Sequence, residues 1–194
     1  MPTYNVSKFI LRALNSIPVR DDIEVIIIDD ASTDNTLDLI KDFWRDTELN
    51  MRVVHLHENR GLSIVMNSAY NLAQGEYFYQ FDPDDWLNTE NWEKALDELD
   101  GTDMVFVDAV THEGVYYDKH DESNFNRCAA WFYFLRKDYL GDERRVHNVY
   151  GGDFEMYMSL ISRPHSKKFT RLCAYNYNYP RVGSITWKTA HGEL

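Results

Sequence analysis

The sequence is poor in cysteine, with only Cys128 and Cys173 among 194 residues, and it contains no CxxC pair. Two isolated thiols fit neither a disulfide framework nor a cysteine zinc site, and they favour a reducing compartment in which both lie in the core. Apolar runs near the roughly 20 residues of a membrane span are also missing, and the first residues do not begin a signal peptide. We therefore expect a cytoplasmic protein without a transmembrane segment.

Positive charge is scarce as well, because 20 Lys and Arg stand against 32 Asp and Glu, a formal net charge of −12. Such a chain is poorly suited to nucleic acid or an anionic membrane as its main partner. A phosphate-bearing ligand would need a bound cation or locally placed basic side chains. Internal repeats and obvious linkers are absent, and the 44% hydrophobic content is typical of a globular protein. One domain over residues 1–194 is expected.

The hydrophobic pattern predicts alternating helices and strands. The expected elements are a helix at 6–17, a strand at 23–28, a helix over 37–44 with an N-cap at 32–34, a strand at 51–56, a helix at 62–73, a strand at 77–81, a helix at 91–99, a strand at 104–107, loop or short strands over 108–121, helices near 125–137 and 153–161, and a strand at 171–179. This order predicts an α/β fold whose central sheet, mostly parallel or mixed, is flanked by helices.

Three aspartates, Asp82, Asp84 and Asp85, follow the aromatic strand at 77–81 and surround Pro83. Carboxylates this close repel one another unless a cation, a hydrogen-bond donor or water compensates them. One interpretation is a polar turn in which an aspartate caps the next helix. The other is a divalent-metal site, because hard oxygen ligands suit Mg²⁺, Mn²⁺ and Ca²⁺.

A second acidic pair, Asp29-Asp30, follows the predicted strand at 23–28. In open α/β sheets, ligands bind beyond the carboxyl ends of the strands. Two acidic clusters at such strand ends favour a binding site over independent capping.

Several segments occur in the order that is found in one enzyme family. They are "PTYN", "VIIIDDASTDNT", "ENRGLSIVMNSAYNLAQGEYFYQFDPDDWL", "GGD" and "YNYPRVGSIT". From Pro2 to Trp187, the chain resembles family 2 glycosyltransferases, which have the Rossmann-like GT-A fold. The resemblance implies a nucleotide-sugar donor, UDP-linked in the first instance, Mn²⁺ or Mg²⁺, a saccharide or other hydroxyl acceptor, and inversion of the anomeric centre. It also implies a nucleotide-sugar-binding half at 1–108 and an acceptor-binding half at 109–194.

The same resemblance implies which residues hold the nucleotide. Pro2 and Tyr4 correspond to the segment beside the nucleobase, although Tyr4 is also explained by packing at a helix entry. Asp30 corresponds to the carboxylate that accepts from the base N3–H, a sensible pairing because a carboxylate only accepts. Asp29 would support it. Arg60 has the positive charge that could approach the diphosphate. The alternative is that Arg60 is a solvated surface residue.

For the metal, Asp84 corresponds to the direct ligand, and Asp82 to a residue near the ribose or a metal-bound water. Asp85 would orient the motif or cap the following helix. His191 corresponds to a late third ligand that some GT-A enzymes recruit, and a non-functional tail explains it equally well. Arg181 and Ser184 resemble a segment that closes over the diphosphate.

Inversion by direct displacement needs a base that takes the proton of the acceptor hydroxyl. Asp153 corresponds to the aspartate that serves at the start of a helix in relatives, and Glu155 is the second candidate. Relatives commonly have Glu-Asp here, whereas this chain has Gly152 before Asp153. The alternative is that Asp153 only stabilises the helix dipole.

The chain departs from its relatives at the start, where they carry an apolar strand before the PTYN motif. Another chain or segment, neighbouring elements, or truncation would explain its absence. A non-catalytic nucleotide-sugar-binding or partner subunit is therefore the first alternative function. A nucleotidyltransferase is disfavoured, since no glycine- and lysine-rich triphosphate loop is found. Homo-oligomerisation stays open.

Overall fold

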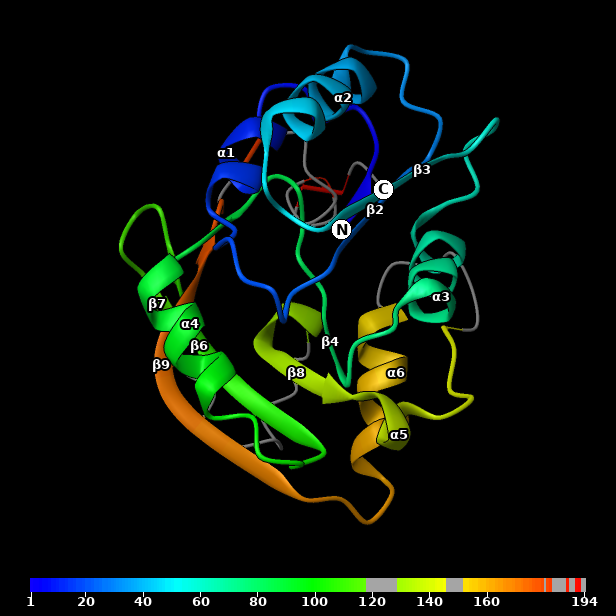
Figure 1. The fold of residues 1–194 in the computed structure, drawn as a ribbon. Coiled ribbons are helices and arrows are strands. Elements are labelled where there is room, and N and C mark those ends of the chain that lie inside the picture. Colours follow the sequence, from blue (N-terminus) through cyan, green and yellow to red (C-terminus); the bar gives the residue numbers. More distant parts are fainter. Residues whose placement is uncertain (118–128, 146–151, 180, 183–187, 189–190, 193–194) are drawn as a thin grey trace.

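The computed structural model describes residues 1–117, 129–145, 152–179, 181–182, 188 and 191–192, and Ser184 and Cys128 lie outside these ranges. Its strands form a three-stranded sheet, in the order β1-β2-β3, and a six-stranded sheet, in which β4-β8-β6-β9-β5 are neighbours and β7 pairs with β6. Figure 1 shows the small sheet in the blue and cyan part of the chain and the larger sheet in the green to orange part.

The small sheet is parallel and built from β1 (Pro2–Thr3), β2 (Val25–Asp29) and β3 (Met51–His55). Every residue of β2 is buried, which confirms the interior strand that its apolar run predicts. Ile26 and Ile28 pack against Val65 of α3 (Leu62–Leu72), whereas Ile27 belongs to the main core on the other face.

The large sheet is mixed. Its strands are β4 (Tyr77–Tyr79), β5 (Trp86–Leu87), β6 (Met104–Thr111), β7 (Tyr116–Tyr117), β8 (Tyr133–Arg136) and β9 (Lys167–Tyr177). Only β6 and β9 pair in parallel, and the other neighbours are antiparallel. The expected sheet, mostly parallel or mixed, is thus confirmed as a parallel small sheet and a mixed large one. β6 crosses residue 108, where the sequence predicts a change from nucleotide to acceptor half, and that division stays a prediction.

The helices lie close to their expected positions in the first half. They are α1 (Ile10–Asn15), α2 (Thr36–Asp46), α3, α4 (Thr89–Asp97), α5 (Lys137–Leu140) and α6 (Gly152–Ile161). The expected capping of α2 at 32–34 is wrong, because its N-cap is Asn35. No helix in the described ranges combines the length and apolarity that crossing a bilayer demands.

The expected helix near 125–137 is wrong over its described part. Ala130–Phe132 forms a single 3-10 turn, and Tyr133–Arg136 is strand β8, which pairs with β4 and β6. Aromatic residues favour strands, and these are buried on both faces of the sheet.

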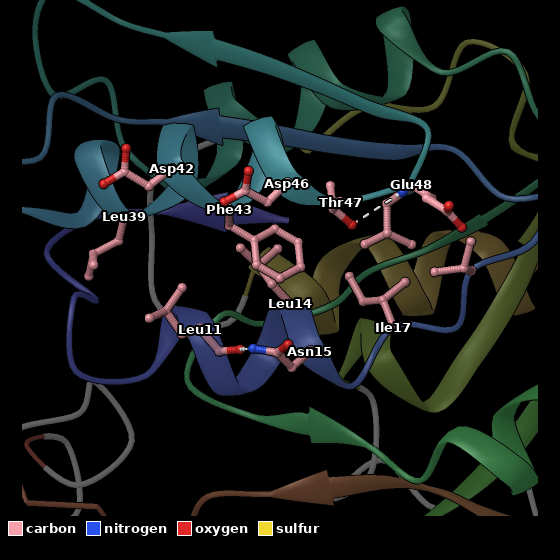
Figure 2. A pocket seen from close by; sticks show the side chains of 12 residues that line it. Leu11, Leu14, Asn15, Ile17, Leu39, Asp42, Phe43, Asp46, Thr47 and Glu48 are labelled. Atoms are coloured by element: carbon pink, nitrogen blue, oxygen red, sulfur yellow. Dashed lines mark hydrogen bonds between the residues drawn. The ribbon is translucent and has the colours of Figure 1, made fainter.

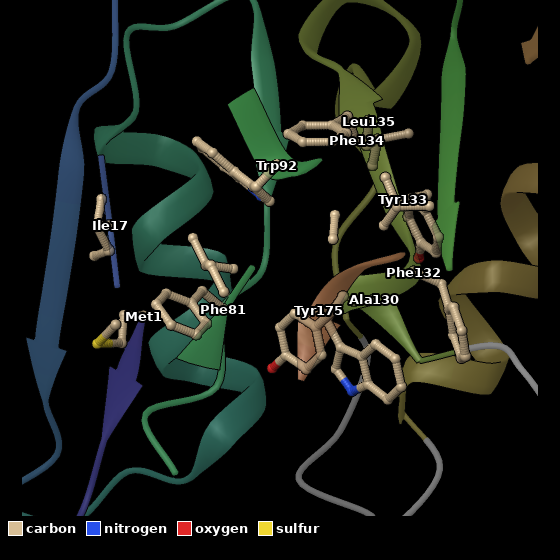
Figure 3. Close-up of a cluster of buried hydrophobic side chains, with 14 of the residues drawn as sticks. Met1, Ile17, Phe81, Trp92, Ala130, Phe132, Tyr133, Phe134, Leu135 and Tyr175 are labelled. Atoms are coloured by element: carbon tan, nitrogen blue, oxygen red, sulfur yellow. The ribbon is translucent and has the colours of Figure 1, made fainter. Parts of the chain in front are cut away.

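The main core lies against the large sheet and is rich in aromatic rings (Figure 3). Trp131 stacks on Tyr175 with ring centroids 4.5 Å apart, and Tyr79 and Trp92 both contact Phe134. Trp131 is therefore a core residue. Cys173 is only half-buried, so the expectation of a core thiol is wrong there.

A groove of about 360 Å³ lies between the two sheets. Its lining includes Val25 from the small sheet, Tyr77 and Tyr79 from the large one, and Ile17 and Trp92. β1 extends over two residues only, so it pairs with the last part of β2 and leaves Val25 without a β1 partner.

Candidate active site

The loop after β1 is locked to the loop after β2. Asn5 has a left-handed backbone with φ 51°, a conformation that asparagine tolerates better than most residues. Its Oδ1 accepts from Thr33 N at 2.8 Å and Asp34 N at 3.3 Å, and its own N donates to Ser32 Oγ at 3.0 Å. Tyr4, which precedes Asn5, is 48% exposed.

Asp29 is fully buried and supports this loop. Its carboxylate accepts hydrogen bonds from the Ser32 backbone N and hydroxyl and from Thr3 Oγ1, and its Oδ2 lies 2.9 Å from His55 Nδ1. The supporting role predicted for Asp29 agrees with these contacts.

Asp30 connects the same loop to α3. Its Oδ1 accepts from Arg60 N at 2.7 Å and its Oδ2 from Gly61 N at 2.8 Å. Gly61 is the N-cap of α3 with φ 82°, a conformation that favours glycine. Asp30 is 4% exposed, and each carboxylate oxygen has a lone pair beyond these bonds that could accept an N–H from a base. The Arg60 side chain forms an ion pair with Glu58, in which Nη1 and Oε1 lie 2.6 Å apart. Its contact with the diphosphate stays a prediction.

The acidic turn after β4 contains two carboxyl groups whose pKa values are raised by burial. Burial, followed by the charges of Asp84 and Asp153, raises the pKa of Asp82 to about 7. Burial, followed by the charges of Asp84 and Asp82, raises the pKa of Asp85 well above its usual value. Tyr175 Oη donates to Asp85 Oδ2 at 2.6 Å, and Asn178 N donates to its Oδ1 at 2.7 Å.

Asp85 therefore orients the motif, and its alternative role as a helix cap is wrong. The N-cap of α4 is Asn88, whose side chain accepts from Asn91 N at 3.2 Å.

Two arginines contact Asp84, the middle aspartate of this turn. Arg181 Nη2 lies 2.7 Å from Asp84 Oδ2, and Arg12 Nη2 donates to the Asp84 carbonyl oxygen at 2.6 Å. Arg12 comes from α1 and lies 3.9 Å above the Trp86 ring. Sequence reasoning missed Arg12, and its place beside an apolar residue on an amphipathic helix gives no signal for this contact.

Asp153 begins α6, as the resemblance predicts, and lies near the same turn. Arg145 Nη2 is 2.6 Å from Asp153 Oδ1 and also donates to Gln80 Oε1 at 2.5 Å. Glu155 is exposed on the same helix. Arg145 lies outside the family segments, and Gln80 lies within one of them but received no role from the sequence, so the roles of both emerge only from the fold.

The residues at this turn fit a divalent cation that binds together with a phosphate ligand. Asp82, Asp84 and Asp153 raise one another's negative potential, which a cation would relieve. Within the described ranges no three His, Cys, Asp or Glu side chains gather as a complete metal cage. Mg²⁺-type ions need only one or two carboxylates when phosphate oxygens and water fill the other positions. His191 lies in a turn after Lys188, and its role as a third ligand stays a prediction.

A separate groove of about 570 Å³ lies between α1 and α2 (Figure 2). Leu11, Leu14 and Phe43 form its apolar walls, and Asp42 and Asp46 lie at its edge. None of the predicted site residues lines it, so we place the candidate active site at the strand ends instead.

Comparison with known proteins shows the family of the chain. The family model described as Glycosyl transferase family 2 matches residues 1–164, and the chain therefore belongs to that family. Over 105 residues it is 35% identical to the poly(ribitol-phosphate) beta-N-acetylglucosaminyltransferase TarS of Staphylococcus aureus, a match that covers 52% of this chain and 18% of that protein.

Two solved structures show the fold. S. aureus TarS 1–349 in complex with UDP-GlcNAc superposes with a TM-score of 0.82 at 24% identity, covering 94% of this chain and 58% of that one. The mannosyltransferase PcManGT from Pyrobaculum calidifontis, in complex with GDP-Man and Mn²⁺, superposes with a TM-score of 0.76 at 19% identity, covering 98% and 59%. The chain thus spans less than two thirds of these relatives, and its fold is the expected GT-A fold.

Proposed function

We propose that this chain is a metal-dependent, inverting glycosyltransferase that moves a sugar from a UDP-linked donor to an acceptor hydroxyl. One observation carries the proposal. Asp82, in the turn between β4 and β5, lies within electrostatic reach of both Asp84 and Asp153 at the start of α6, and Arg181 pairs with Asp84. The site thus combines ligands for a metal–diphosphate with a carboxylate on a separate element.

The nucleotide would lie at the loops after β1 and β2. Tyr4 presents a half-exposed ring for stacking, and Asp30 presents a carboxylate with free acceptor positions. A relative of the same fold is described in complex with UDP-GlcNAc, which supports a uridine nucleotide. The nucleotide half at 1–108 and the acceptor half at 109–194 are part of this proposal.

Asp84, with Asp82 beside it, would hold the divalent ion. When bound, such an ion neutralises charge on the diphosphate leaving group. The description of PcManGT with Mn²⁺ supports a metal of this type. Arg181 would turn from Asp84 to the phosphates, because its planar fork of donors matches phosphate oxygens.

The chemistry then needs one proton acceptor. Asp153 takes the proton of the acceptor hydroxyl as its oxygen forms a bond to the anomeric carbon. The bond from that carbon to the phosphate oxygen breaks on the opposite face, and the nucleoside diphosphate leaves with the electron pair. Attack opposite the leaving group inverts the anomeric centre. Glu155 is the second candidate for the base.

The experiment is a panel of nucleotide sugars, each incubated with the protein, Mn²⁺ or Mg²⁺ and a mixture of hydroxyl acceptors. Release of nucleoside diphosphate is measured by chromatography, and excess chelator is the control. We expect release from a UDP-sugar that chelator abolishes. Donor binding without release over the whole panel would instead indicate a non-catalytic nucleotide-sugar-binding subunit.

A further inference from the structure

Arg145 is a buried cation that no sequence motif contains. Its side chain is 1% exposed, and it lies in the segment after α5, far in sequence from every residue it contacts except Asp153. A buried arginine stays charged, so its charge must be compensated. Tyr70, Asp153 and Tyr133 all interact electrostatically with Arg145, and its Nε has no hydrogen-bond partner among the described residues. Of these partners, Asp153 is the one with a proposed role in the reaction.

Arg145 contacts the proposed base directly. Its Nη2 lies 2.6 Å from Asp153 Oδ1, and this oxygen accepts no directed hydrogen bond from the described residues. The contact is thus an ion pair that fixes one oxygen of the carboxylate. The Asp153 side chain is 26% exposed, so the carboxylate still reaches solvent or an acceptor.

The same guanidinium reaches the acidic turn through Gln80. Arg145 Nη2 donates to Gln80 Oε1 at 2.5 Å, and Gln80 Nε2 donates to Asp82 Oδ1 at 2.8 Å. The two partners determine the orientation of the amide, because a guanidinium only donates and a carboxylate only accepts. One continuous chain of polar contacts thus joins Asp153 to Asp82.

The backbone of Arg145 is fixed as well. Asn67 of α3 accepts from Arg145 N at 3.0 Å and donates to Arg145 O at 2.9 Å. The backbone of Arg145 is therefore anchored to α3. The side-chain amide of Asn67 makes both bonds, one as donor and one as acceptor.

We infer that Arg145 is a positioning residue that orients Asp153 for proton transfer, and that Gln80 extends this support to Asp82. The inference rests on the proposed function. It explains how Asp153 is supported although Gly152 provides no side chain beside it: a cation from the segment after α5 does so. The charges around Asp82 are consistent with this contact. Burial, Asp84 and Asp153 raise the pKa of Asp82, whereas Gln80 and Arg145 lower it.

The experiment compares Arg145→Met with the control Arg144→Met. Arg144 is the adjacent arginine and also contacts α3, where it donates to Asn71 Oδ1 at 2.7 Å, but it does not contact Asp153. For Arg145→Met we expect kcat for sugar transfer to fall by about 100-fold. UDP affinity measured by calorimetry with Mn²⁺ should change by less than about threefold. Added ethylguanidinium should restore part of the rate, and Arg144→Met should behave as the wild type.

Two further variants keep the test decisive if Arg145→Met does not fold. Arg145→Lys keeps the charge but cannot serve Asp153 and Gln80 together, so we expect a kcat loss of at least about tenfold. Gln80→Leu breaks the bridge to Asp82 and should raise the donor KM more than it lowers kcat.

Three results would overturn the inference. A wild-type kcat in both Arg145 variants, with only the melting temperature lowered, would show a merely structural role. A loss in Arg144→Met equal to that in Arg145→Met would show a general effect on this segment. If the wild type transfers no sugar from any donor, the proposed function fails, and the inference fails with it because there is no base to orient.

Discussion

Arg181 and Asp84 form an ion pair in which Nη2 and Oδ2 lie 2.7 Å apart and both side chains are about one quarter exposed, at 28% and 22%. In the proposed function, the aspartate holds the metal and the arginine holds the diphosphate. The two groups thus neutralise each other before a donor arrives. Binding of a metal–nucleotide would supply each with a new partner of opposite charge.

Asp84→Ala should abolish metal-dependent release of nucleoside diphosphate, because the ion loses its direct ligand. The fold should persist, since Asp84 is partly exposed in the turn between β4 and β5. Circular dichroism and product release check both statements, with Asp42→Ala as a control that removes an exposed carboxylate paired with Arg45 at 3.1 Å. Equal turnover of the wild type with and without excess chelator would contradict the metal role.

Asp153→Asn should retain nucleotide affinity and lose transfer by about 100-fold or more, because an amide does not accept the hydroxyl proton. Glu155→Gln is the matched control on the same helix, where its side chain is exposed. Calorimetry with UDP and steady-state transfer rates separate binding from chemistry. Normal transfer in Asp153→Asn with loss in Glu155→Gln would assign the base to Glu155.

The metal-free protein should be more stable at low pH through Asp82. Its pKa is raised to about 7 from the usual 3.8, so the folded state binds the proton more tightly than the unfolded state. The resulting stability is fully present below about pH 4 and is lost as pH rises through 7, and it amounts to about 4 kcal/mol at most. Asp82→Asn should therefore raise the free energy of unfolding at pH 8 in chelator and leave it nearly unchanged at pH 4.

Chemical denaturation of the wild type and Asp82→Asn at both pH values provides the measurement. The difference between the two proteins removes the contribution of other titrating groups. A variant that is no more stable than the wild type at pH 8 would show that Asp82 ionises there without cost.

Tyr175→Phe should destabilise the fold by about 2 kcal/mol, because it leaves the buried Asp85 carboxyl without its phenol donor. Tyr79→Phe is the comparison, since Tyr79 Oη donates to the neutral Trp131 carbonyl oxygen at 2.7 Å. We expect about 1 kcal/mol for that loss. Urea unfolding gives both values, and a smaller effect for Tyr175 than for Tyr79 would mean that Asp85 finds another donor.

Sequence reasoning located the first half of the fold well because its strands and helices carry strong periodic signals. β2 is a run of apolar residues and is buried along its whole length, as predicted. The second half was harder. The aromatic run from Trp131 to Phe134 is compatible with a helix or a strand by composition, and only its pairing with β4 and β6 decides for a strand.

The residues of the candidate site could be predicted where they belong to family motifs. They could not be predicted where their role depends on contacts between distant parts of the sequence. Asp82, Asp84 and Asp153 come from recognisable segments, and the structure brings them within electrostatic reach. Arg145 and Gln80 are 65 residues apart in sequence and meet only after folding. No local pattern reveals a contact of that kind, because neither residue differs by type or spacing from surface residues of the same class.

α3 links two parts of the site that lie on different loops. Asp30 accepts from Arg60 N and from Gly61 N, the N-cap of α3, and Asn67, about 9 Å further along the axis, anchors the backbone of Arg145. The carboxylate proposed to bind the nucleobase and the arginine proposed to orient Asp153 are thus both attached to one helix. A substitution that shifts α3 should therefore alter nucleotide binding and sugar transfer together.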